Sequence, residues 1–297
     1  MLFKICTPIF QSFRRTIMIR ILTDSTCDIS PEEAKQLGVS VVPLCVNFAD
    51  KHYLDGVDIT PEQFYEMLAE ADKLPTTSQP SPEIFMSHFE AAKAAGDEVV
   101  CVLLSSALSG TYQSAEIAKD EVGYDKIHLI DSRAVTIALG LLVRRAVKDL
   151  NEGATAQEIV ADIEHACEHV HAYAVVDTLK YLHKGGRLST TAAIAGGLLG
   201  IKPVVGLVDG KVAMVGKARG VPGAYLKIFK LIDEVGGVDK KYPVITGYTG
   251  DAHGIEPFTR FIMQNLHMPK PHTDSIGAVI ATHLGHGAKG IAFFDAQ

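Results

Sequence analysis

The chain has 297 residues, of which 47% are apolar, 21% charged and 7% aromatic. This composition excludes a wholly disordered chain and a collagen-like repeat, and the length favours two domains. The formal net charge of -7 argues against a general nucleic-acid-binding protein, because no overall positive field would attract phosphates. Five scattered cysteines favour a reducing cytoplasm over a disulfide framework, and no apolar run reaches the ~18 residues of a membrane span.

The first 17 residues differ from the rest of the chain. They carry Lys4, Arg14 and Arg15 but no acidic residue. A transit-like or membrane-surface segment would explain them, but the basic residues follow the apolar ones, unlike in a secretory signal. We favour a non-native start, with the protein beginning at Met18. Without this leader the net charge falls from -7 to -10.

Strand and helix signals alternate up to about residue 170. Apolar runs predict strands, and capping residues such as Ser30 with Glu33 and Thr155 with Glu158 predict helix starts. The predicted strands are 19–23, 39–48, 98–104 and 127–130, and the predicted helices follow Ser30, Thr60 and Ser81 and cover 111–122, 134–150 and 155–169. Such alternation indicates an α/β domain with a mostly parallel sheet and helices on both faces.

Glycine marks a change of character near residue 170. Residues 1–170 contain 7 of the 26 glycines and residues 171–297 contain 19. The second part predicts a mixed or antiparallel sheet with helices, its hairpin turning at Asp209-Gly210. Its predicted strands are 172–177, 203–208, 211–215, 243–248, 276–282 and 289–294, and its predicted helices are 190–200, 224–235 and 257–266. We therefore expect two α/β domains, 18–170 and 171–297, with a crevice between them.

Three polar segments are candidates for ligand binding. Ser25 follows the first strand, where ligands bind in open α/β sheets, although a capping turn is an equal alternative. Thr77 lies in a hydroxyl-rich stretch before a helix. Ser109 and Gly110 join a buried strand to a helix N-terminus, where free N–H groups suit an anion and glycine allows close approach. Each alone is typical of capping, but together they indicate a cradle for a carboxylate or phosphate.

Histidine motifs need separate interpretation. His283 lies among glycines and could point into the crevice, although a lone histidine is usually structural. The segment His-Ala-Cys-Glu-His-Val-His (165–171) resembles a metal site, and His165 and His169 share a helix face. That face also carries acidic residues, so we interpret it as a solvated polar face and expect no metal. The match of 285–290 to G-x-G-x-x-G is not a dinucleotide site, because no helix or distant acid follows.

Basic residues cluster only locally. They include Lys217 and Arg219, and the segment 180–187 with its Lys, His and Arg residues. Such charges usually solvate a surface, but on an acidic chain they could form a docking patch for an acidic partner.

The polar segments, taken in order, resemble those of a known family. They are TDSTCDI (23–29), PTTSQPSP (75–82), LSSALSGTYQSA (104–115), IDSR (130–133), TLKYLHKGGRLS (178–189), LLGIKPV (198–204) and GAVIATHLGHGAKGIAF (277–293). This set resembles the DegV family of bacterial fatty-acid-binding proteins, which includes the binding subunits of fatty acid kinase. The resemblance covers nearly all of 18–297 and implies two α/β domains with the acyl chain in a slot between them.

By motif, the resemblance implies that Thr77, Ser109 and His283 bind the carboxylate of a long-chain free fatty acid, with Arg187 as a further family feature. It implies a cytoplasmic carrier without catalytic residues, cofactor or ATP site, which presents the fatty acid to an ATP-dependent kinase for acyl-phosphate formation. Transient contact with a membrane is compatible with such a carrier. Two departures stand out. His286 replaces the family's proline between two glycines, and the stretch after the K-x-R motif of Lys217 and Arg219 is less basic than the family pattern.

Two other functions remain open. One is a phosphotransferase or hydrolase on a related fold, as in dihydroxyacetone kinase, for which His283 or His286 would bind the substrate covalently. The other is a lipid-sensing regulatory protein that needs no kinase.

Overall fold

The computed structural model describes residues 17–71, 73–189 and 200–296. Their strands form a parallel four-stranded sheet, a mixed six-stranded sheet and a small antiparallel sheet of three strands. The proposed leader, apart from Ile17, and nearly all of the helix predicted at 190–200 lie outside the described residues. Within the described part of the chain, no helix combines the length and apolar character needed to span a membrane.

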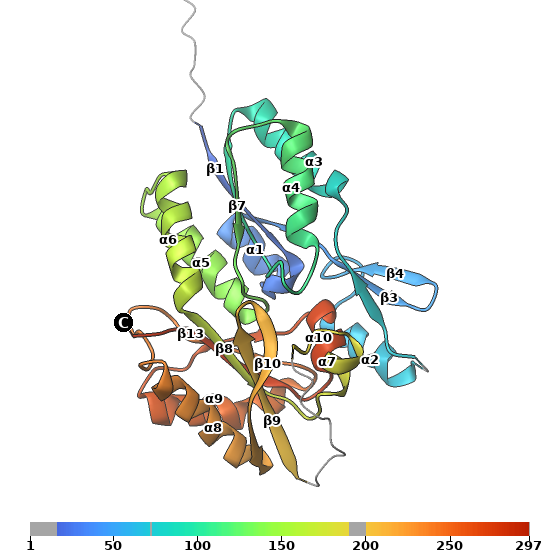
Figure 1. The fold of residues 1–297 in the computed structure, drawn as a ribbon, viewed down its shortest axis with the longest axis vertical. Helices are drawn as coiled ribbons and strands as arrows, with labels where there is room; N and C mark the ends of the chain where they lie inside the picture. The colour runs from blue at the N-terminus through green and yellow to red at the C-terminus, as the bar shows by residue number, and fades with distance from the viewer. Residues whose placement is uncertain (1–16, 72, 190–199, 297) are drawn as a thin grey trace, which may run out of the picture.

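The parallel sheet has the strand order β2-β1-β6-β7. These strands are β1 (Ile19–Asp24), β2 (Val39–Val42), β6 (Glu98–Leu103) and β7 (Ile127–Asp131). Helices α3 and α4 pack on one face and α5 and α6 on the other (Figure 1). These four helices are α3 (Pro82–Ala95), α4 (Thr111–Val122), α5 (Ile137–Asn151) and α6 (Ala156–His169). A shorter helix, α1 (Pro31–Leu37), connects β1 and β2. The expected parallel sheet with helices on both faces is confirmed.

The mixed sheet has the strand order β10-β9-β8-β13-β11-β12. Only β11 and β12 are parallel, as the predicted mixed sheet allows. The strands are β8 (Val170–Val175), β9 (Ile201–Val208), β10 (Lys211–Arg219), β11 (Ile245–Tyr248), β12 (His272–Ser275) and β13 (Lys289–Phe294). Helices α8 (Gly220–Glu234) and α9 (Glu256–Leu266) cover its outer face (Figure 1). Asp209 and Gly210, both at positive φ, form the predicted hairpin turn.

Helix α5 lies between the two large sheets. It contacts β1 and β6 of the parallel sheet and β8, β11 and β13 of the mixed sheet. The first two turns of α5, residues 137–143, are apolar and buried on every side, as expected of a helix segment enclosed by other elements. Gly140 allows the α5 backbone to approach the short 3-10 helix η1 (Ser25–Cys27), since a Cβ there would lie 2.5 Å from the carbonyl oxygen of Cys27. The two sheets therefore share one apolar core through α5.

The small sheet was not expected. The β-rich run predicted at 39–48 divides into β2 and β3 (Cys45–Phe48), which belong to different sheets. Strand β3 pairs with β4 (Lys51–Leu54) and with β5 (Thr76–Ser78), and α2 (Pro61–Glu70) connects these last two. Thr77, expected in a loop before a helix, is thus held in a strand opposite Val46.

The strand predicted at 276–282 is wrong, because this segment forms helix α10 (Ala278–Leu284). Its β-branched residues favour a strand, but carboxylates far away in the sequence cap the helix start. Asp28 Oδ1 accepts a hydrogen bond from the Gly277 N–H at 2.8 Å, and Asp55 Oδ1 accepts one from the Ala278 N–H at 2.9 Å. Helix α10 packs beside the short helix α7 (Lys180–Lys184).

The predicted helix starts are mostly confirmed. Thr155 and Glu158 form a complete capping box at α6. At α1 only half of the predicted box forms: Ser30 Oγ accepts from the Glu33 N–H at 3.2 Å. The Glu33 carboxylate instead pairs with Arg144 of α5, which offers a charge-assisted bidentate contact.

Candidate ligand-binding site

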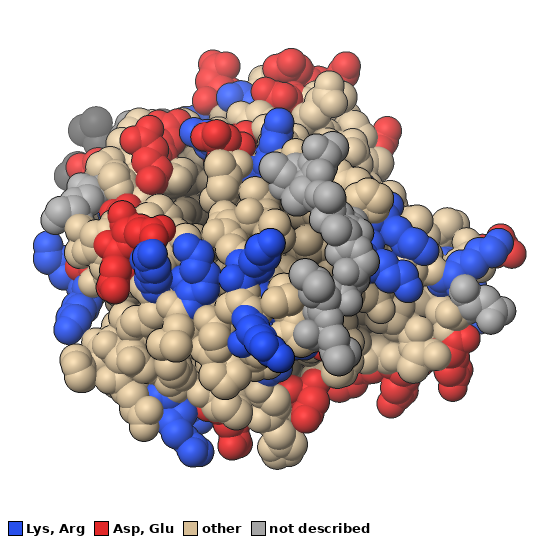
Figure 2. Space-filling view, turned by 60° about the horizontal axis from the view of Figure 1, so that its bottom comes forward, with Lys and Arg blue, Asp and Glu red and all other residues tan. Residues whose placement is uncertain are grey.

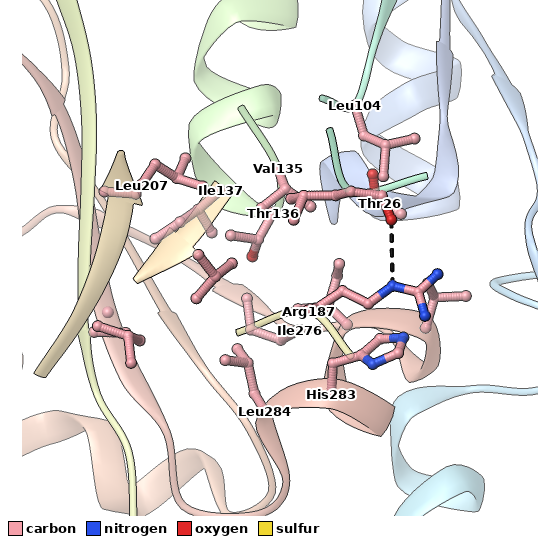
Figure 3. Close-up of a pocket in the computed structure, with 18 of the residues that line it drawn as sticks. Thr26, Leu104, Val135, Thr136, Ile137, Arg187, Leu207, Ile276, His283 and Leu284 are labelled. Atoms are coloured by element: carbon pink, nitrogen blue, oxygen red, sulfur yellow. Dashed lines mark hydrogen bonds between the residues drawn. The ribbon is translucent and has the colours of Figure 1, made fainter. Parts of the chain in front are cut away.

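A cavity of about 370 Å³ lies between the parallel and mixed sheets. Residues from both halves of the chain line it (Figure 3). Most lining side chains are apolar: Leu44, Leu104, Leu108, Val135, Ile137, Ala172, Ala174, Leu182, Val205, Leu207, Val212, Ile276, Val279, Ile280, Leu284, Ala288 and Ile291. Such a lining suits an apolar ligand, since a buried polar group would need hydrogen-bond partners that these side chains lack.

Several polar lining residues meet at one side of the cavity, although Thr136 lies apart from them, beside Val135 and Ile137. In Figure 3, Arg187 and His283 lie next to each other, whereas Ile137 and Leu207 lie on the opposite side. Thr77 belongs to the same polar group, because its Oγ1 lies 2.9 Å from His283 Nε2. The arrangement can hold a molecule with one polar end and a long apolar body.

His283 is neutral in this environment. Burial, helped by the positive charge of Arg187, lowers the pKa of His283 to about 4. Its Nδ1 is buried and has no hydrogen-bond partner among the described residues. This nitrogen faces Gly185, where a Cβ would lie 2.3 Å away. The ring is therefore fixed between Thr77 and the main chain of Gly185.

Arg187 brings a positive charge to the polar end. Its Nε donates to the Leu108 carbonyl at 3.2 Å and its Nη1 to the Gly185 carbonyl at 2.7 Å. These two contacts join the loop before α4 to the end of α7. The guanidinium has five N–H donors, so the two contacts to carbonyls leave donors available to a carboxylate.

Ser109 lines the cavity, and Gly110 caps α4 behind it. Ser109 Oγ lies 2.9 Å from Thr111 Oγ1 and accepts a hydrogen bond from the Thr111 N–H at 3.3 Å. Gly110 is not among the lining residues. A Cβ there would lie 2.2 Å from the Gln79 side chain, so glycine makes room for that side chain.

Ser25 lies outside the cavity lining, and its neighbour Thr26 lines it instead. Ser25 Oγ accepts a hydrogen bond from the Leu44 N–H at 3.1 Å. His286 is likewise outside the lining. It is exposed and packs edge-on against Tyr65, with ring centroids 5.5 Å apart. The exposed Lys217 and Arg219 lie on edge strand β10, away from the polar group.

Sequence reasoning missed two kinds of residue. Gln79 and Thr26 line the cavity. The available signal was their position in the same polar segments, since Thr26 directly follows Ser25 and Gln79 lies two positions after Thr77. Asp28 and Asp55 support the site from behind by capping α10, the helix that carries His283. Burial raises the pKa of Asp28 well above its usual range and that of Asp55 to about 6, because burial disfavours the charged carboxylate.

Comparisons with known proteins found a matching family and similar chains. A family model described as "Uncharacterised protein, DegV family" matches residues 18–296. A DegV domain-containing protein of Caldanaerobacter subterraneus is 38% identical over 275 residues, which cover 93% of this chain and 98% of that protein.

Two solved structures of similar proteins are described by their binding of fatty acids. A DegV family protein from Thermus thermophilus, described by its fatty acid binding, is 33% identical with a TM-score of 0.84, covering 94% of this chain and 100% of the other. A stearic-acid-binding protein from Eubacterium ventriosum is 30% identical with a TM-score of 0.85, covering 94% of this chain and 98% of the other.

Proposed function

Because the chain belongs to the DegV family, we propose that it binds one long-chain fatty acid in the cavity between its two large sheets. The carboxylate would lie at Thr77, Ser109 and His283, with Arg187 beside them, and the acyl chain along the apolar lining. The observation that carries this proposal is the gathering of Thr77, Arg187 and His283 at one side of a mainly apolar cavity.

The energetics favour this occupant. Burying ~14 methylenes at ~0.8 kcal/mol each gives at most roughly 11 kcal/mol. Burying a carboxylate opposes binding unless donors meet it. Neutral donors come from the Ser109 hydroxyl and from the Thr77–His283 pair, in which the His283 Nε2–H can donate to Thr77 Oγ1 and leave the Thr77 hydroxyl proton for the carboxylate. Arg187 adds a positive charge nearby. The carboxylate would remain unmodified and able to accept a phosphoryl group.

We further propose that the chain is a carrier that presents its fatty acid to an ATP-dependent kinase. His286 is outside the cavity lining, and the His283 ring is held by Thr77 and Gly185, which disfavours the covalent histidine that a related phosphotransferase would need. A cytoplasmic location would follow from the need for ATP. The four described cysteines are free, as a reducing compartment allows.

Docking of such a kinase would use the basic residues. Figure 2 shows Lys and Arg side chains gathered in a band across one face, with Asp and Glu mostly toward the upper and lower edges of the view. Lys211, Lys217 and Arg219 are exposed on β10, an edge strand of the mixed sheet. A partner with an acidic surface would be attracted to this strand.

The direct test is to purify the protein and identify its extracted ligand by mass spectrometry. We expect one long-chain fatty acid per chain. An apo protein that takes up no added fatty acid would contradict the proposal.

A turnover assay with ATP and fatty acid on the isolated chain separates the carrier from an enzyme, since the carrier should form no acyl phosphate alone. A carrier whose ligand is left unphosphorylated in lysate supplied with ATP would favour the lipid-sensing alternative.

A further inference from the structure

The C-terminal turn of α6 gathers three metal-ligating side chains. His165, Glu168 and His169 are spaced i, i+3 and i+4, and one ligand atom from each lies within 4.8 Å of the other two. His165 and Glu168 are exposed and His169 is partly buried. Cys167 packs against the apolar core instead and is not part of this group.

A carboxylate supports this group from behind. Asp295 Oδ1 lies 3.1 Å from His169 Nδ1, and Oδ2 lies 2.8 Å from His171 Nε2. The main chain fixes this carboxylate, because the Asp295 N–H donates to the His169 carbonyl at 3.0 Å. A metal-binding histidine usually donates a hydrogen bond from the N–H of its second ring nitrogen to such a carboxylate, which orients the ring. Here the contact at Nδ1 leaves Nε2 of His169 for an ion.

A second cluster of possible metal ligands among the described residues already has a cationic side chain as its partner. Glu33, His272 and Asp274 also lie within 4.8 Å of one another. Their positive partner is already present: Arg144 Nε lies 2.7 Å from Glu33 Oε1, and its Nη2 lies 3.1 Å from Asp274 Oδ2. In the described part of the chain, no Lys or Arg forms an ion pair with Glu168. The negative end of the α6 dipole also favours a cation at this turn.

We propose that His165, Glu168 and His169 bind one divalent transition-metal ion of the class that imidazole prefers, such as Zn²⁺, Ni²⁺ or Cu²⁺. The sequence alone favoured a solvated face, and the structure adds the convergence of the ligand atoms and the carboxylate behind His169. The exposed side chains of His165 and Glu168 can rotate to the ~2.0–2.2 Å that Zn²⁺ requires from nitrogen and oxygen. Water would complete the coordination shell.

Because this site lies where α6 meets the mixed sheet, a bound ion should stabilise the folded protein. His169 ends α6 and the next residue starts β8, while Asp295 directly follows β13, the partner strand of β8. A bound ion would join this turn of α6 more firmly to the end of the mixed sheet. Because an ion that binds only the folded state stabilises it, metal should raise the unfolding temperature.

The test titrates the purified full chain with Zn²⁺ by calorimetry and follows thermal unfolding with and without the metal. We expect one tight equivalent and a higher unfolding temperature. His165→Ala should weaken this binding at least tenfold and remove the thermal shift. A matched control is His253→Ala: this exposed histidine lies near Glu256 at i+3, but the pair lacks a second histidine, and we expect unchanged binding.

Asp295→Asn tests the supporting carboxylate and should weaken binding about 10–100-fold, as loss of such a partner usually does. His165→Gln provides a second ligand variant if the alanine variant does not fold. Equal Zn²⁺ affinity in the native chain and both His165 variants would overturn the proposal. Equal losses in the His165 and His253 variants would also overturn it, since that pattern indicates scattered surface binding.

Discussion

Thr77 Oγ1 and His283 Nε2 lie 2.9 Å apart although 206 positions separate them in the sequence. Thr77 is fixed by the small sheet, and His283 by a helix whose first N–H groups bond Asp28 and Asp55. The contact therefore joins the two halves of the chain at the polar end of the cavity. Several consequences of this arrangement can be measured.

Thr77→Val should weaken fatty-acid binding by about 10–100-fold, because a hydrogen bond to a charged group contributes about 1.5–3 kcal/mol. Valine keeps the shape and strand preference of threonine but has no hydroxyl. Thr77→Ser restores the donor and should bind nearly as well as the native chain. Calorimetric titration with a long-chain fatty acid measures both. Equal affinities of the valine and serine variants would mean that Thr77 does not contact the carboxylate.

His283 should make stability depend on pH. Its pKa is about 4 in the folded protein but 6.5 in the unfolded chain, so between these values the unfolded state binds more protons. The free energy of unfolding should therefore fall by about 2–4 kcal/mol from this group as the pH drops from 7 to 4. His283→Gln should lack this loss. Urea unfolding of both proteins at several pH values provides the comparison, and parallel pH profiles would contradict the prediction.

Asp55 should make the free energy of unfolding fall as the pH rises, the opposite of the effect of His283. Burial raises its folded pKa to about 6, above the usual 3.8, so the folded state holds the proton more tightly. Its contribution to stability is present below about pH 4 and is lost as the pH rises through 6, by about 2–4 kcal/mol. Asp55→Asn keeps an oxygen for the Ala278 N–H and removes the titration. Relative to the native chain, this variant should gain stability between pH 4 and 7, measured by urea unfolding.

Gly185→Ala should displace the His283 ring. A Cβ at this position would lie 2.3 Å from Nδ1, and the backbone φ of -75° leaves the new side chain unstrained. We expect at least a tenfold loss of fatty-acid affinity with the secondary structure retained. Gly254→Ala is the control, because its Cβ would meet only the end of Lys289, at 3.5 Å. Similar affinity in the two variants would indicate that ring placement is unimportant for binding.

The sequence was most informative where the signals are local. The apolar strand 98–104 and the capping box of Thr155 and Glu158 are confirmed, because neighbouring residues alone decide them. The hydroxyl and histidine segments also pointed to Thr77, Ser109 and His283, which all line the cavity. Their role in holding a carboxylate stays a prediction.

Distant contacts explain what the sequence could not predict. Val279 and Ile280 suggested a strand, and only the carboxylates of Asp28 and Asp55 explain the helix start there. The separation of β2 from β3 likewise depends on pairing with a strand more than twenty positions later, as in the contact of Val46 with Thr77. Such pairings set the side-chain directions at the site, and no local pattern encodes them.

Helix α5 has a final consequence for how the molecule loses its structure. Its side chains belong to one apolar core that contains residues of the parallel sheet, such as Val100, and of the mixed sheet, such as Ile245. Neither sheet can lose that helix without exposing apolar surface on the other. The two halves should therefore melt in a single cooperative transition, with equal calorimetric and van't Hoff enthalpies, rather than as two independent units.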